Sequence, residues 1–81
     1  MTNVPARTLD FYDRHVVTLI VEKYNLAELD ALQKFINSET YTMLRSPELD
    51  LYGVSPYFIF DMWEAEMISG DPRNSIYIRG N

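Results

Sequence analysis

The sequence predicts an all-α protein, a compact bundle of three to four helices with a short extended C-terminal arm. Apolar residues recur at helical spacing in several segments, and two Ser-Pro dipeptides stand where helices would begin. Strand-like alternation is confined to a brief stretch near the end. The 81 residues have the length of one domain. We assign residues 1–81 to it, with a loose lead over 1–7 and a tail over 70–81.

The first helix is expected from Thr8 or Asp10, either of which can act as its N-cap, to about Tyr24. The β-branched residues of 16–21 make a strand the competing interpretation. Polar residues recur here at every fourth position and not at every second, which favours a helix. Its broad apolar stripe consists of Leu9, Tyr12, Val16, Val17, Leu19 and Ile20.

A second helix is predicted from Leu26, after Asn25, which is suited both to ending the first helix and to capping the next. The pattern breaks at Ser38, which is positioned to cap a further short helix through Leu44. One continuous but kinked helix over 26–45 is the alternative. The apolar face of the second helix is predicted to consist of Leu26, Leu29, Leu32 and Ile36.

The two Ser-Pro dipeptides predict helix starts, because serine caps and proline suits the first helical position, where its missing N–H costs nothing. Ser46-Pro47 is expected to open a single turn over 47–51. Ser55-Pro56 is expected to open a full helix to about Ile68, which Gly70 then ends.

The last helix has apolar residues on two sides. One predicted face consists of Ile59, Phe60, Trp63 and Met67. The nearly opposite face consists of Phe58, Met62 and Ala65. Such a helix is either enclosed by its own fold or shared with a partner, and the abundance of aromatic and Met side chains favours a partner. The candidate interface residues, including two from the arm, are Tyr57, Phe58, Met62, Trp63, Ala65, Ile76 and Ile78.

The charge of the chain disfavours nucleic acid as a partner. The net charge is −5, and the seven basic residues are scattered rather than clustered. Residues 46–69 hold five acidic residues and no basic one. Either a basic partner is steered to this segment or, more commonly, such residues form a solvated acidic face. We interpret Asp61, Glu64 and Glu66 as a solvated flank, with Glu66 directed away from the other two.

The sequence shows no catalytic machinery, so we expect a protein that is not an enzyme and that uses no cofactor and no metal. His15 is the one histidine, interpreted as structural, and there is no cysteine. No glycine-rich phosphate loop and no nucleophile motif occur. The longest aliphatic run, over 16–21, is far shorter than the ~20 residues that span a bilayer. We therefore expect no membrane contact, no targeting segment and a cytoplasmic location.

Three stretches resemble a family of small uncharacterised bacterial proteins: N-S-E-T-Y-T-M-L-R-S-P-E-L-D-L-Y over 37–52, S-P-Y-F-I-F-D-M-W-E-A-E over 55–66 and G-D-P-R-N-S-I-Y-I-R over 70–79. Proteins of this kind are one-domain helical chains, some of them encoded beside toxin-like or phage-derived genes. The resemblance implies an accessory or antitoxin-like protein that acts by binding another protein.

The sequence leads us to expect one of two functions. The first is a protein-interaction module that binds another chain, either a second copy in a dimer or higher homo-oligomer, or a neighbouring gene product. The alternative is a small-ligand-binding or sensor domain with an aromatic pocket. That pocket would be lined by Tyr52, Tyr57, Phe60 and Trp63.

Overall fold

The computed structural model describes residues 6–46, 49 and 51–74, and within them it shows four α-helices and no strand. The all-α prediction is therefore confirmed. The elements follow in the order α1 (Ala6–Tyr24), α2 (Glu28–Ile36), α3 (Glu39–Arg45), the 3-10 turn η2 (Leu51–Gly53), α4 (Pro56–Ser69) and the 3-10 turn η3 (Pro72–Asn74).

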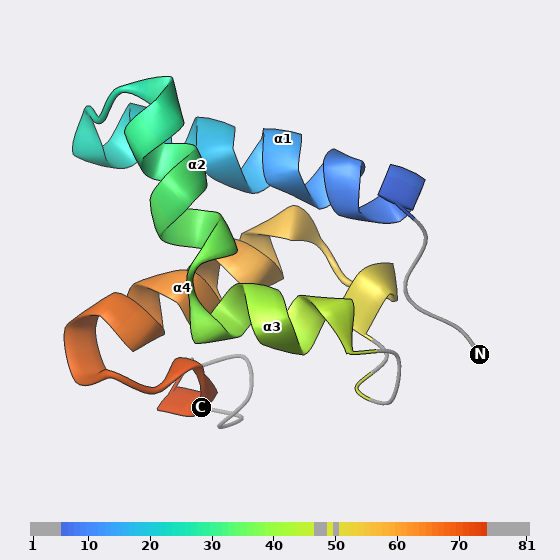
Figure 1. Ribbon diagram of the computed structural model, residues 1–81. Coiled ribbons are helices and arrows are strands. Elements are labelled where there is room, and N and C mark those ends of the chain that lie inside the picture. The colour runs from blue at the N-terminus through green and yellow to red at the C-terminus, as the bar shows by residue number, and fades with distance from the viewer. Residues whose placement is uncertain (1–5, 47–48, 50, 75–81) are drawn as a thin grey trace.

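Helix α4 is the central element. It packs against α1, α3 and η3, while α2 contacts α1 and α3 (Figure 1). Every α-helix contributes to one buried core. Its apolar members are Tyr12, Val16, Val17, Ile20, Ala31, Phe35, Leu44, Ile59, Met62 and Trp63.

Helix α1 confirms the helical interpretation of residues 16–21, and it begins at Ala6, earlier than the predicted caps. It ends at Tyr24 because Asn25 adopts a left-handed backbone with φ of 56°. Asparagine tolerates that conformation better than most residues. Asn25 does not cap α2, since the N-cap position is held by Ala27, whose side chain makes no capping hydrogen bond.

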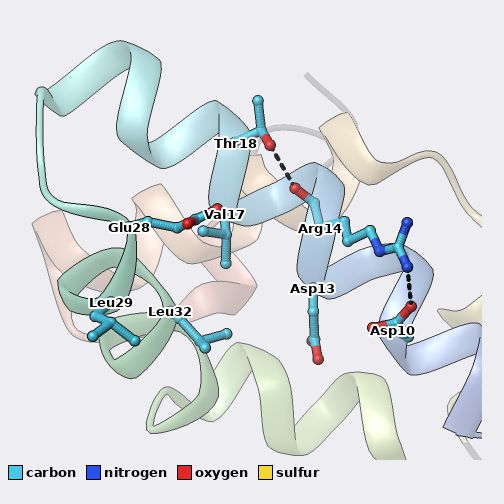
Figure 2. A pocket seen from close by; sticks show the side chains of 8 residues that line it. All are labelled: Asp10, Asp13, Arg14, Val17, Thr18, Glu28, Leu29 and Leu32. Atoms are coloured by element: carbon cyan, nitrogen blue, oxygen red, sulfur yellow. Dashed lines mark hydrogen bonds and ion pairs between the residues drawn. The ribbon is translucent and has the colours of Figure 1, made fainter.

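Helix α2 buries its predicted apolar face only in part: Leu32, and Leu26 just before the helix, are half-buried and pack against the core. Its buried residues are Ala31 and Phe35, whereas Leu29 is 72% exposed and Ile36 is also exposed. Ala31 and Phe35 lie four residues apart, so they share one side of the helix. The leucines on the neighbouring face instead border an open cavity of about 430 Å³ between α1 and α2 (Figure 2).

The serine caps at Ser38 and Ser55 are confirmed, and the break at Ser38 excludes one continuous helix over 26–45. The Ser38 hydroxyl accepts a hydrogen bond from the Tyr41 N–H at 3.1 Å and caps α3. Ser55 does the same for α4 through the Tyr57 N–H, also at 3.1 Å. Gly70 ends α4 with φ of 85°, a left-handed value that glycine adopts freely.

Two predicted segments fall largely outside the described residues. The turn over 47–51 is described at residues 49 and 51 alone, and a 3-10 turn begins at Leu51. Of the tail over 70–81, residues 72–74 form η3 and are not extended. Residues 75–81, with Ile76 and Ile78, lie outside the described part of the chain. None of the described helices is long and apolar enough to cross a membrane.

The Trp63 side chain is 3% exposed, which confirms that it is buried. Its indole N–H donates to the Lys34 carbonyl at 3.4 Å, and its ring stacks on Phe60. We predict that Trp63→Ala lowers the free energy of unfolding by about 3–5 kcal/mol, because it leaves a large cavity in the core. Urea unfolding followed by far-UV circular dichroism measures this.

The control for that measurement is Ile68→Ala. Ile68 is 83% exposed, so its truncation is expected to change the stability by less than about 0.5 kcal/mol. Equal midpoints for Trp63→Ala and the unmodified protein would contradict the assigned core.

Candidate functional site

The two predicted faces of α4 merge into a single buried face. Its centre runs through Ile59, Met62 and Trp63, the buried residues of the helix, and continues one turn on to Glu66. Met67, assigned to one of the two faces, is instead exposed. Met62 and Trp63 belong to the core and offer no surface to another chain.

The remaining candidate interface residues are distributed unevenly. Phe58 and Ala65 are half-buried, and Phe58 packs against the core. Tyr57 is 64% exposed. Among the candidates that the structure describes, Tyr57 is therefore the one with a largely open side chain. It lies in the first turn of α4, beside α1.

Tyr57 and α1 share an exposed face. Tyr57 borders a hollow of about 350 Å³ together with His15, Leu19 and Pro56. Phe11, which is 47% exposed, packs against His15 with ring centroids 4.5 Å apart and the ring planes tilted by 55°. We call these five residues, Phe11, His15, Leu19, Pro56 and Tyr57, the aromatic surface.

Charged residues flank the aromatic surface. Arg7, Asp10 and Arg14 border a second hollow, of about 240 Å³, together with Phe11 and His15. Glu22 borders the hollow at the other end. An apolar centre with a charged rim is the usual composition of a protein–protein interface.

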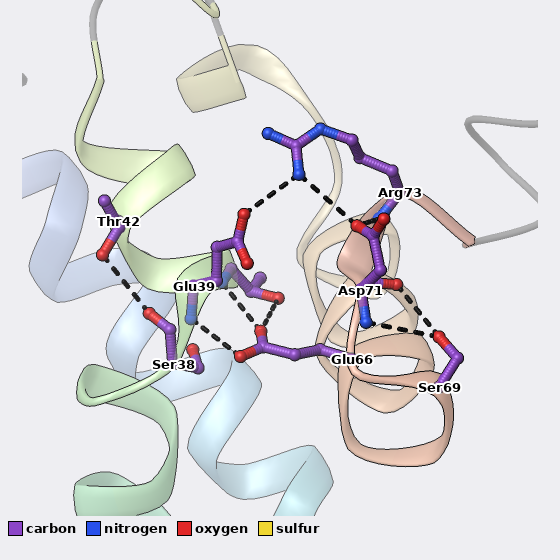
Figure 3. A network of polar contacts seen from close by, with 8 residues as sticks. Ser38, Glu39, Thr42, Glu66, Ser69, Asp71 and Arg73 are labelled. Atoms are coloured by element: carbon purple, nitrogen blue, oxygen red, sulfur yellow. Dashed lines mark hydrogen bonds and ion pairs between the residues drawn. The ribbon is translucent and has the colours of Figure 1, made fainter.

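Glu66 is not part of a solvated flank, contrary to the prediction. Its carboxylate accepts hydrogen bonds from the backbone N–H groups of Glu39 at 2.8 Å and of Thr40 at 2.9 Å (Figure 3). The Thr40 hydroxyl donates a third at 2.8 Å. Glu39 and Thr40 open α3, where helical N–H groups lack partners and negative charge is favoured. Glu66 therefore caps α3 from another helix.

Glu64 is engaged as well. It pairs with the Lys23 ammonium at 2.6 Å and accepts a hydrogen bond from the Tyr24 hydroxyl, and its side chain is only 15% exposed. The hydrogen bond with Glu64 raises the pKa of Lys23, and it raises the pKa of Tyr24 too. Glu64 thus joins the end of α1 to α4, and two of the three predicted flank residues are structural.

The predicted aromatic pocket does not form as proposed. Trp63 lies in the core with Phe60 stacked on it, while Tyr57 points to the α1 side and borders a different hollow. The Tyr52 side chain lies outside the described part of the molecule. Across the described residues, no three His, Asp or Glu side chains are grouped so that they could hold a metal ion.

The cavity between α1 and α2 contains an unusual carboxylate. The Oδ1 atom of Asp13 is shielded from water and has no hydrogen-bond partner among the described groups. Burial raises the pKa of Asp13, and the nearby negative charge of Asp10 adds to the effect. Asp10 itself pairs with Arg14 at 3.2 Å.

Comparisons with protein-family models, with curated proteins and with solved structures find no match to this chain.

We predict that replacing Glu66 with alanine lowers the free energy of unfolding by about 2 kcal/mol, because two N–H groups of α3 lose a charged acceptor. Glu66→Gln, which keeps an acceptor oxygen without the charge, should cost clearly less. Chemical denaturation of both variants measures the difference. Equal stability of Glu66→Ala and the unmodified protein would show that the cap contributes nothing.

Asp13→Asn should stabilise the protein at neutral pH. Since the folded-state pKa of Asp13 lies above its ordinary value of 3.8, the folded state binds this proton more tightly than the unfolded state. The ionised Asp13 therefore lowers the free energy of unfolding at neutral pH, and this loss of stability disappears as the pH falls through the raised pKa of Asp13. The melting temperature of the variant should exceed that of the unmodified protein by a few degrees at pH 7, and the gap should narrow towards pH 4.

The matched control is Asp30→Asn, at an exposed aspartate of α2 outside the cavity. It should leave both the melting temperature and its pH dependence nearly unchanged. A lower melting temperature for Asp13→Asn at neutral pH would contradict the assigned environment of Asp13.

Proposed function

We propose that this protein is a non-enzymatic interaction module that self-associates through the aromatic surface. The observation that carries the proposal is that Tyr57 and Phe11 are 64% and 47% exposed on one continuous face. Large aromatic side chains are costly to leave in water, and they are enriched among the residues that dominate binding energy.

A second copy of the chain is the partner that this face fits best. The outer stripe of α1 consists of Arg7, Phe11, His15, Leu19 and Glu22, of which Leu19 is half-buried and the others are exposed. It begins with a positive charge, ends with a negative one and has His15 at its middle. The neighbouring Lys23 is held by Glu64. Two such stripes are complementary in charge when the helices run antiparallel, because the positive end of each then meets the negative end of the other.

A two-fold axis near His15 would use that complementarity. Two α1 helices packed antiparallel would place Arg7 of each copy beside Glu22 of the other, and Phe11 beside Leu19. Tyr57 would cover the edge of the contact. The same patch then serves both copies, as a two-fold interface requires. An antitoxin-like or accessory role would use this surface on a different chain.

Sedimentation equilibrium over a wide concentration range tests self-association. The unmodified protein should form dimers. Phe11→Lys and Tyr57→Lys should each weaken dimerisation roughly tenfold or more, because each places a charge in the apolar centre of the contact. The matched control is Ile68→Lys, which adds the same charge at an 83% exposed position of α4, and it should dimerise normally.

The antiparallel arrangement has its own test. Arg7→Glu should weaken the dimer by a few fold, as expected for an exposed ion pair, and the double variant Arg7→Glu with Glu22→Arg should restore it. A monomer at every concentration would contradict self-association. Equal weakening by Ile68→Lys would contradict the assigned surface.

A further inference from the structure

The cavity between α1 and α2 is a second feature, separate from the centre of the aromatic surface. Its volume of about 430 Å³ lies within the range of about 300–1,000 Å³ that is usual for small-molecule sites. Helix α1 lines one side and the start of α2 the other (Figure 2).

One part of the lining is apolar. Val17 is buried beneath the cavity, Leu32 is half-buried, and Leu29 exposes 72% of its surface. These three side chains are aliphatic and form the apolar wall of the cavity. They fit a short hydrocarbon stem, whose burial would remove both partners from water.

The other part of the lining is acidic, and Asp13 forms no ion pair with any residue that the structure describes. Arg14 is the basic residue of the lining, and it is directed along α1 to Asp10 (Figure 2). Oδ1 of Asp13 accepts no hydrogen bond from the described residues and is shielded from water. A donor or counter-charge for this carboxylate can therefore arrive only at its other oxygen. Glu28, across the cavity on α2, adds a second negative charge.

We infer that this cavity binds an organic cation with a short aliphatic stem, an alkylammonium or alkylguanidinium group. The cation donates to the outer oxygen of Asp13 and faces Glu28, while the stem lies on Val17, Leu29 and Leu32. A charge-assisted hydrogen bond in a partly desolvated site is stronger than one in water. An anionic ligand would meet three carboxylates against one arginine that is already paired.

The raised pKa of Asp13 agrees with this assignment. Burial and the charge of Asp10 disfavour the ionised carboxylate, and a bound cation opposes both effects. The chemistry is shared by two sources, a free amine and the lysine side chain of another protein.

The test is an NMR titration of the full chain with n-butylamine, which is cationic at neutral pH, observed at the methyl groups of Val17, Leu29 and Leu32. We expect saturable shifts with a dissociation constant in the millimolar range, as suits so small a ligand. 1-Butanol has the same stem and no charge, and it should bind at least tenfold more weakly. Asp13→Asn should weaken n-butylamine binding at least tenfold, whereas Asp30→Asn should leave it unchanged.

A blocked tripeptide with one central lysine separates the two sources. Tighter binding of the peptide than of n-butylamine assigns the site to a protein side chain, and the reverse assigns it to a free amine. The inference is overturned if n-butylamine gives no saturable shift, if 1-butanol binds equally well, or if Asp13→Asn binds n-butylamine as the unmodified protein does. Since Asp13→Asn is expected to be the more stable protein, loss of binding cannot be ascribed to unfolding.

Discussion

The carboxylate of Glu66 joins α3 to α4, and the packing of α3 against the core depends on this contact. Helix α3 has seven residues, too few to be stable alone. Its first N–H groups face α4, where they would lack partners without Glu66. With this cap in place, Thr40 and Leu44 of α3 are fully buried. Ion pairs of Arg73 with Glu39 and Asp71 extend the same junction to η3 (Figure 3).

Helix α4 packs against α1, α3 and η3, and both sites proposed for this protein use side chains of α1. One side of α1 carries Phe11 and His15 towards Tyr57. Another side, with Asp13 and Val17, faces the cavity beside α2. The same 19-residue helix therefore contributes to the core, to the proposed dimer contact and to the proposed cation site.

Local features of the fold could be predicted from the sequence because their causes are local. Serine caps, a left-handed Gly70 and a helical spacing of polar residues act over a few positions. The faces of α4 could not be predicted, since Glu66 lies at the centre of the buried face and its partners are 26 and 27 residues away. The aromatic surface was missed for a similar reason. The i, i+4, i+8 spacing of Phe11, His15 and Leu19 was visible, but the approach of Tyr57 depends on tertiary packing.

Amide hydrogen exchange at Glu39 and Thr40 tests the central claim, which is that Glu66 of α4 caps α3 and holds the two helices together. These are first-turn amides, which a helix leaves unpaired. The account predicts protection comparable to that of amides inside α4. Helix α2 supplies an internal reference, because its cap position, Ala27, offers no acceptor side chain, so Glu28 and Leu29 should exchange quickly. Exchange of Glu39 and Thr40 as fast as that of Glu28 and Leu29 would contradict the account.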